Sequence, residues 1–152
     1  MSHPQDAIEV RDSIRSLLRD PVTKSLLANS QLTVSQLETL LTDSISTGIG
    51  AQKSTRRLLS PSRAKISRGA YNRTLIQAQT NVIRSIYTIL LLGYLRLFDS
   101  ASLQPFLELS DTIDSYVHES KSDTRGLAEL NARLLEFAST LAKRQSFKDK
   151  LS

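Results

Sequence analysis

The stretch from Gly69 to Phe98 constrains the fold more than any other part of the chain, because its apolar residues recur every three or four positions over a long segment without proline. This spacing is typical of a helix that buries one face. From Ile86 to Leu95 the apolar character continues around the whole circumference, so we expect the second half to be buried on most sides. Arg84 and Arg96 enclose only eleven residues of this part. A bilayer requires about 20 apolar residues, so the segment is predicted to be the central helix of a folded domain.

The composition favours helices elsewhere as well. The 152 residues include only 5 glycines and 4 prolines, and aromatic residues make up 5%. Sheets normally need more β-branched and aromatic residues and more turn residues. We therefore predict an all-α fold, a single helical bundle of about five to six helices in one domain spanning 1–152. Its predicted parts are N-terminal helices in 1–50, a basic bridge at 51–68, the central helix at 69–98 and a C-terminal helical hairpin at 102–145.

Three helices are expected before the basic bridge. The first covers residues 5–19, and a short second one starts at Pro21. Thr33 is a plausible N-cap for the third, which would point Leu37, Leu40, Leu41 and Ile45 inward and end near Gly48 and Gly50. Within the bridge, Ser60-Pro61 could start a further short helix. Gly93 in the central helix indicates a close neighbour or a kink.

The residues after the central helix predict a helical hairpin. Apolar residues recur at steps of three and four residues in two segments. The first segment holds Phe106, Leu109 and Ile113, and the second holds Leu127, Leu130, Leu134, Phe137 and Leu141. The second pattern is the a/d spacing of a coiled coil over about two heptads. Packing of the hairpin onto the central helix is the preferred interpretation, and a homodimer seam is the alternative.

Charge is distributed unevenly along the chain. The formal net charge is +5, yet Ser44 to Phe98 holds nine basic residues and no acidic one, which leaves 11 basic and 15 acidic residues elsewhere. Ordinary surfaces mix both signs, so a block of one sign points to a partner of the opposite sign. Seven of the nine cations fall within 53–73: Lys53, Arg56, Arg57, Arg63, Lys65, Arg68 and Arg73.

The sequence offers little for catalysis. There is no cysteine, and the two histidines are His3 and His118. No metal-ligand spacing, nucleophile motif or glycine-rich phosphate loop is present. We expect no enzyme activity, no cofactor, no metal site and no small-molecule substrate.

The basic block ends in a more specific pattern, Ile66-Ser67-Arg68-Gly69-Ala70-Tyr71-Asn72-Arg73-Thr74-Leu75-Ile76-Gln77-Ala78. Ser67 can cap the helix, which would put Arg68, Tyr71, Asn72 and Arg73 on its first turns and turn Ala70, Leu75 and Ala78 inward. Residues 66–78 resemble the recognition half of a helix-turn-helix in sigma-factor-like transcription regulators. This resemblance implies a helix start that faces a DNA groove. Residues 51–65 depart from that motif because they contain no well-formed amphipathic helix.

The leading hypothesis is a non-enzymatic DNA-binding protein, a transcription regulator, located in the cytoplasm or with the nucleoid or nucleus. Its phosphate contacts would be Lys53, Arg56, Arg57, Arg63 and Lys65, and its groove contacts Arg68, Tyr71, Asn72 and Arg73. DNA is favoured over RNA because the basic window offers a single aromatic ring for stacking. The alternative is a helical interaction module whose basic loop docks on an acidic protein. Membrane insertion is not expected, since the basic segment lacks bulky apolar residues.

Overall fold

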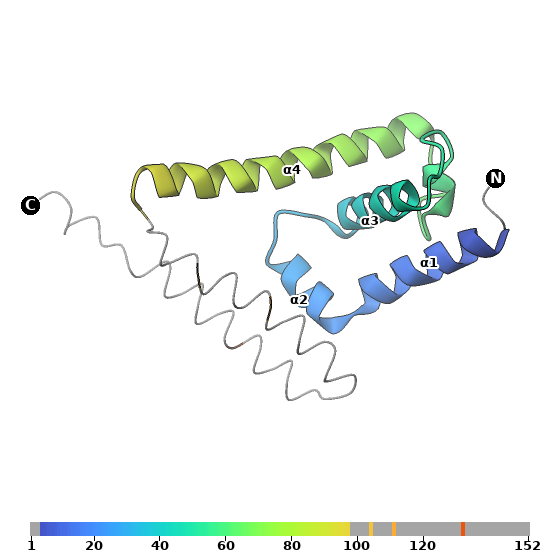
Figure 1. Cartoon of the computed structure of the whole chain (residues 1–152), viewed down its shortest axis with the longest axis horizontal. Coiled ribbons are helices and arrows are strands. Elements are labelled where there is room, and N and C mark those ends of the chain that lie inside the picture. The colour runs from blue at the N-terminus through green and yellow to red at the C-terminus, as the bar shows by residue number, and fades with distance from the viewer. Residues whose placement is uncertain (1–3, 98–103, 105–110, 112–131, 133–152) are drawn as a thin grey trace, which may run out of the picture. The chain divides into compact units, whose positions relative to one another are not determined.

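The computed structural model describes residues 4–97 and the single positions 104, 111 and 132. This part forms four α-helices and one 3₁₀ helix and contains no strand, which confirms the predicted all-α class for these residues. The helices are α1 (Pro4–Arg19), α2 (Pro21–Ala28), α3 (Val34–Gly48), η1 (Arg56–Leu59) and α4 (Arg68–Tyr94) (Figure 1).

Contacts divide the chain into two units, Met1–Tyr87 and Thr88–Ser152, and α1, α2, α3 and η1 all belong to the first. The predicted hairpin at 102–145 and the alternative dimer seam fall almost entirely outside the described residues. The total of five to six helices and the single domain therefore stay predictions.

The boundaries of the first three helices follow local signals in the sequence. The Asp20 carboxylate accepts a hydrogen bond from the Thr23 amide at 2.7 Å, and Pro21 occupies the first turn of α2. Thr33 and Gln36 form a reciprocal capping box at the start of α3, as predicted for Thr33. Gly50 has a φ of 73°, and the Ala51 amide donates to the Ser46 carbonyl at 2.8 Å. This is the glycine-terminated helix end expected there.

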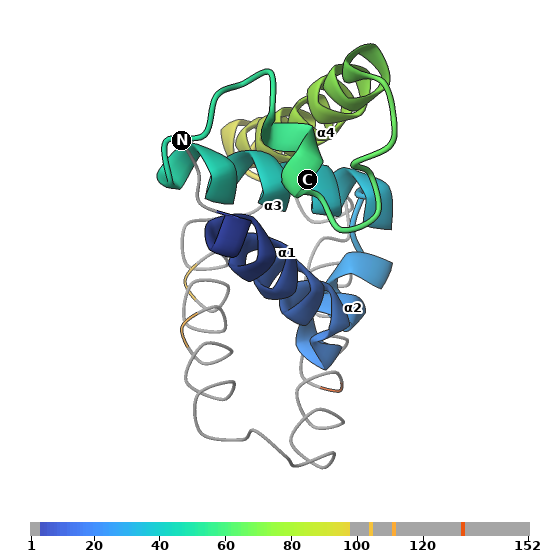
Figure 2. The ribbon, with the colours of Figure 1, turned by 90° about the vertical axis from the view of Figure 1, so that its right-hand side faces the viewer.

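The apolar core lies where α1 meets α3 and η1. Val10 and Ile14 of α1 are 6% and 0% exposed and pack with Ala51 and Leu59. Leu41 and Ile45 of α3 are half-buried against this cluster. Figure 2 shows α1 running beneath α3. The core therefore joins the N-terminal helices to the basic bridge, which contributes both Ala51 and Leu59.

The most deeply buried face of α3 is polar, which differs from the expected leucine face. Its members are Glu38, Thr39, Thr42 and Ser46, at 3%, 0%, 0% and 0% exposure, whereas Leu37, Leu40, Leu41 and Ile45 are half-buried. The two threonine hydroxyls donate to carbonyls one turn earlier in their own helix, at 2.7 Å each. Such bonds satisfy the two threonine hydroxyls without an external partner, whereas the buried Ser46 hydroxyl has no hydrogen-bond partner in the described residues.

Glu38 fastens the basic bridge to α3. Its carboxylate accepts hydrogen bonds from the Ser60 hydroxyl, from the Ser62 amide at 2.8 Å and from the Ser62 hydroxyl at 2.6 Å. The expected helix start at Ser60-Pro61 is wrong: the 3₁₀ helix η1 precedes Ser60, and residues 61–65 form turns. The Ser60 hydroxyl is engaged chiefly by the buried carboxylate rather than by a following helix.

Helix α4 packs antiparallel to α3 through Tyr71, Leu75 and Ala78, which are 3%, 8% and 0% exposed. Tyr71 meets Thr39, and further along α4 the Asn81 amide group donates to the Gln31 carbonyl and the Gln36 side chain at 3.3 Å each. Leu75 and Ala78 thus face inward as predicted, whereas Ala70 is half-buried.

The second half of α4 differs from its prediction, since Ile86 and Leu90 are 52% and 60% exposed. Helix α4 has 27 residues and α3 has 15, and the buried residues of α4 all lie in its first half, at Tyr71, Leu75 and Ala78. A Cβ added at Gly93 would meet no atom within 4 Å. Within the described residues no helix is long and apolar enough to cross a membrane.

Helix α4 ends at Tyr94, before the predicted Phe98. Arg96 adopts a left-handed φ of 55°, and the Leu97 amide donates to the Leu92 carbonyl at 2.8 Å. This hydrogen bond closes the helix end in the geometry usually taken by glycine, a stop that the apolar pattern does not reveal.

The hydrogen bonds from Ser60 and Ser62 to Glu38, which we call the Glu38 clasp, predict how stability depends on pH. Burial by itself would raise the pKa of Glu38, but the hydrogen bonds from Ser60 and Ser62 outweigh it and hold the pKa below its usual 4.5. The ionised form is thus favoured in the folded state, so its stabilisation is present above about pH 4.5 and is lost as the pH falls further. Glu38→Gln should lower the free energy of unfolding at neutral pH by about 1–3 kcal/mol. It should also flatten the acid limb, the part of the pH profile below about pH 4.5 where the free energy of unfolding falls. Urea denaturation at several pH values measures both effects.

Glu9→Gln is the matched control, because Glu9 is exposed on α1. It should leave the stability at neutral pH and the acid limb close to those of the wild type. An acid limb of unchanged steepness in Glu38→Gln would contradict the assigned role of the clasp.

Candidate nucleic-acid interface

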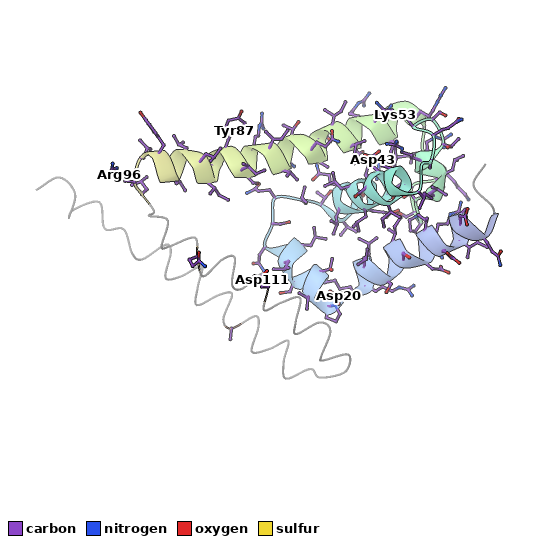
Figure 3. The ribbon with its side chains drawn as sticks, viewed as in Figure 1. Asp20, Asp43, Lys53, Tyr87, Arg96 and Asp111 are labelled. Atoms are coloured by element: carbon purple, nitrogen blue, oxygen red, sulfur yellow. The ribbon has the colours of Figure 1, made fainter. Side chains whose placement is uncertain are left out.

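The site lies where the basic bridge meets the first turns of α4. Ser67 precedes this helix, and its hydroxyl accepts the Ala70 amide at 3.1 Å, as expected for a cap. The preceding bridge is held by Glu38 on one side and by the core residue Leu59 on the other. The cations of the bridge are therefore presented on a folded support. Figure 3 shows Lys53 on the bridge above α3, the helix that carries Asp43.

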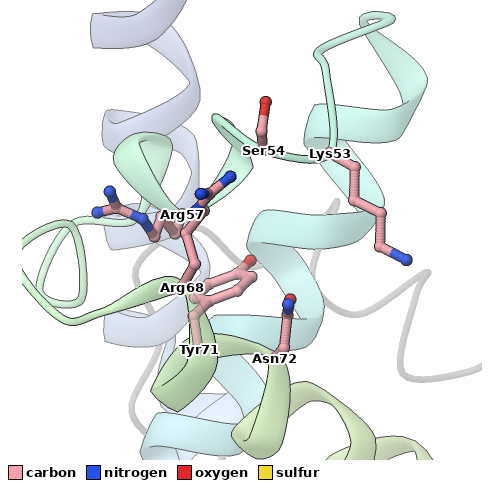
Figure 4. A pocket seen from close by; sticks show the side chains of 6 residues that line it. All are labelled: Lys53, Ser54, Arg57, Arg68, Tyr71 and Asn72. Atoms are coloured by element: carbon pink, nitrogen blue, oxygen red, sulfur yellow. The ribbon is translucent and has the colours of Figure 1, made fainter.

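A pocket of about 340 Å³ opens between the bridge and α4. Its lining comprises Lys53, Ser54 and Arg57 from the bridge and Arg68, Tyr71 and Asn72 from α4 (Figure 4). The three α4 residues lie at positions i, i+3 and i+4 and so share one face of the first turns. Five of the nine residues predicted for the interface meet here: Lys53, Arg57, Arg68, Tyr71 and Asn72. The lining holds three cations and no carboxylate.

Four cations of the predicted set are available to a partner. Lys53, Lys65, Arg68 and Arg73 are exposed. In the part of the chain that the structure describes, none of them forms an ion pair or a side-chain hydrogen bond. We call these four residues the basic surface. Asn72, next to Arg73, is exposed as well.

Arg56 and Arg63 have a different role from the predicted phosphate contacts. The Arg56 guanidinium forms an ion pair with Asp43 at 3.0 Å and also donates to the Ala51 carbonyl. Arg63 donates to the Thr74 hydroxyl at 3.0 Å. Both side chains are half-buried. These contacts tie the bridge to α3 and α4 and occupy the groups expected to meet phosphate.

Arg57 combines both roles. One terminal nitrogen donates to the Ala64 carbonyl at 2.8 Å and to the Ile66 carbonyl at 3.2 Å, which joins the two ends of the turn before α4. Its Nε is buried without a hydrogen-bond partner in the described residues. No carboxylate there pairs with it, so its charge still contributes to the pocket.

Tyr71 belongs to the core and not to a groove-facing surface, which corrects the prediction for this residue. Its side chain is buried, and its hydroxyl donates to the Thr39 carbonyl at 3.3 Å. Burial raises the pKa of Tyr71 to about 12, and the negative charge of Asp43 adds to the rise. The ring thus forms part of the pocket wall without being available for stacking.

Three further residues of this region were not predicted from the sequence. Ser54 lines the pocket, and Asp43 and Glu38 shape the bridge from α3. Asp43 is the last acidic residue before the basic block, a position that could have identified it as a partner. In the described residues no three His, Asp or Glu side chains gather as metal ligands would.

The α-helix that precedes the resembled segment, α3, ends at Gly48, and α4 begins at Arg68, with the 3₁₀ helix η1 between them. This connection is much longer than the turn of three or four residues in a standard helix-turn-helix. The role of residues 66–78 as a recognition helix remains a prediction.

Replacing Tyr71 with phenylalanine tests its structural role. The change removes the hydrogen bond to Thr39 and should lower the free energy of unfolding at neutral pH by about 0.5–1.5 kcal/mol. Because the folded state favours the neutral phenol, the wild type should lose stability as the pH rises from about 10 to about 12. Tyr71→Phe should lose less over this range, as measured by urea denaturation. Tyr94→Phe, at a side chain 83% exposed, should retain the wild-type profile, and identical alkaline profiles for both variants would contradict the assignment.

Comparison of this chain with models of known protein families, with curated proteins and with solved structures finds no match.

Proposed function

We propose that this protein binds nucleic acid, in the first place duplex DNA, through the basic surface formed by Lys53, Lys65, Arg68 and Arg73. One observation carries the proposal: in the described residues these four cations are exposed and have no ion-pair or hydrogen-bond partner. The neighbouring arginines instead bind groups of the protein that hold the bridge in place. A folded support that displays several cations without ion-pair partners among the described residues is suited to a polyanion.

The arrangement of the cations supports phosphate binding. Arg68 and Arg73 belong to the first two turns of α4, while Lys53 and Lys65 come from the bridge on either side of η1. Like charges repel each other, and a row of phosphates relieves this repulsion and releases counterions when it binds. The first turn of α4 adds backbone amides without helical partners, which also favour an anion.

Duplex nucleic acid is favoured over single strands because of Tyr71. Proteins that bind single strands stack bases on exposed aromatic rings. Tyr71 is the only aromatic residue between Lys53 and Arg73, and its ring is 3% exposed. The basic surface therefore offers charge and hydrogen-bond donors but no stacking platform.

Sequence readout, and with it a role in transcription regulation, would depend on Asn72 and Arg73. Both are exposed at the start of α4, and Asn and Arg side chains can form paired hydrogen bonds with adenine and guanine edges in the major groove. This extends the resemblance of residues 66–78 to a recognition helix.

The salt dependence of binding tests the proposal. With four phosphates neutralised, the logarithm of the association constant for a short duplex should fall against the logarithm of salt concentration with a slope of about −3.6. Lys65→Gln or Arg73→Gln should each make the slope shallower by about 0.9. Fluorescence anisotropy with a labelled duplex measures both quantities.

Arg19→Gln is the matched control, since Arg19 is an exposed cation in the last turn of α1, outside the basic block. It should bind duplex like the wild type. A slope near zero, or equal losses for Arg19→Gln and Arg73→Gln, would remove the proposal. Nuclease-resistant capture of an acidic protein through the basic surface would instead support the interaction module.

A further inference from the structure

We propose that the pocket between the basic bridge and α4 binds a phosphate monoester, the group that ends a 5′-phosphorylated nucleic-acid strand and that a free nucleotide also carries. If the ligand is the end of a 5′-phosphorylated strand, this inference rests on the proposed function. It assigns the pocket a ligand that differs from the internal phosphates met by the surrounding surface.

The pocket is lined by more positive charge than the single negative charge of an internal phosphate requires for neutralisation. Lys53, Arg57 and Arg68 all line it, and no acidic residue does. A phosphodiester inside a strand carries a single negative charge, whereas a phosphate monoester carries about −1.5 to −2 near neutral pH. Three cations around one cavity therefore match the monoester better.

The donors of the pocket suit the same group. The Ser54 hydroxyl and the Asn72 amide add neutral donors to the cationic ones. The buried Nε of Arg57 has no hydrogen-bond partner in the described residues, which leaves a donor unsatisfied in a residue that lines the pocket. Arg11 and Arg63, which do not line the pocket, have the same buried and unpaired Nε, so the assignment rests on the charges of the lining.

The size of the pocket favours binding of the phosphate at the end of a strand over a phosphate inside a strand. Its volume of about 340 Å³ is near the lower end of small-ligand pockets. An internal phosphate is bonded on both sides, so the backbone passes across a cavity. A terminal phosphate is bonded on one side and can enter it. Figure 4 shows Lys53 and Ser54 on the bridge and Tyr71 and Asn72 on α4, with the Ser54 side chain directed away from these two α4 residues.

The test compares two blunt duplexes of identical sequence, one with 5′-phosphate and one with 5′-hydroxyl ends, at the same ionic strength. The wild type should bind the phosphorylated duplex about tenfold more tightly, as expected for added hydrogen bonds between charged groups. Arg68→Gln and Lys53→Gln should bind both duplexes alike. Lys65→Gln and Arg73→Gln remove exposed cations that do not line the pocket, so they should weaken both duplexes while keeping the tenfold preference.

A third arm identifies the source of the phosphate. Thymidine 5′-monophosphate should bind in isothermal titration calorimetry, thymidine should not, and Arg68→Gln should abolish the difference. A preference for the phosphorylated duplex supports a strand end as the ligand. Binding of the free nucleotide without such a preference supports the free nucleotide instead.

The outcomes also separate this inference from the proposed function. Equal binding of both duplexes together with no binding of the nucleotide overturns the inference and leaves nucleic-acid binding intact. If neither duplex binds, the proposed function fails, and the nucleotide arm alone then decides the inference: binding that depends on Arg68 supports it, and the absence of binding overturns it. Circular dichroism spectra of all variants verify that each one is folded.

Discussion

The buried carboxylate of Glu38 is the interaction on which the rest of the site depends. An ionised group is costly to bury, and here three hydrogen bonds from Ser60 and Ser62 offset that cost. The same bonds draw a segment rich in lysine and arginine onto α3, although its charges repel one another. Because Leu59 enters the core beside Ser60, apolar packing and the buried carboxylate hold the bridge at adjacent positions. The bridge, held at these two positions, contributes Lys53, Ser54 and Arg57 to the pocket lining.

Apart from Arg57, which has both roles, the cations at 53–73 divide into two groups by their partners. Arg56 and Arg63 are half-buried and bind groups of the protein itself, namely Asp43 and Thr74. Lys53, Lys65, Arg68 and Arg73 are exposed. In the first group, the ion pair with Asp43 offsets the charge of Arg56, and in the second group no ion pair forms within the described residues. A count of charges along the sequence treats all of them alike, so it does not separate the cations that bind groups of the protein from those that stay exposed.

Helix α4 links the site to the rest of the fold through one short face. Tyr71, Leu75 and Ala78 are buried against the neighbouring structure, while Arg68, Asn72 and Arg73 remain outside on the same turns. A helix turns by about 100° per residue, so adjacent positions can serve packing and recognition at once. Tyr71 is an example: it lies between the exposed Arg68 and Asn72 in sequence, yet its side chain is buried and its hydroxyl donates to the Thr39 carbonyl.

Local signals in the sequence determined the helical class, the first three helices with the Asp20, Thr33 and Gly50 ends, and the start of α4 at Ser67, because capping and apolar spacing act within one or two turns. They also located the segment that carries the basic surface. Only the tertiary structure decided that Glu38 and not a leucine face lies deepest in α3, that Tyr71 is buried, and which cations remain exposed. Each of these depends on contacts between residues that are 11 to 32 positions apart. No local rule specifies such pairings, because they arise only when the chain folds back on itself and places a hydroxyl or a carboxylate beside a distant partner.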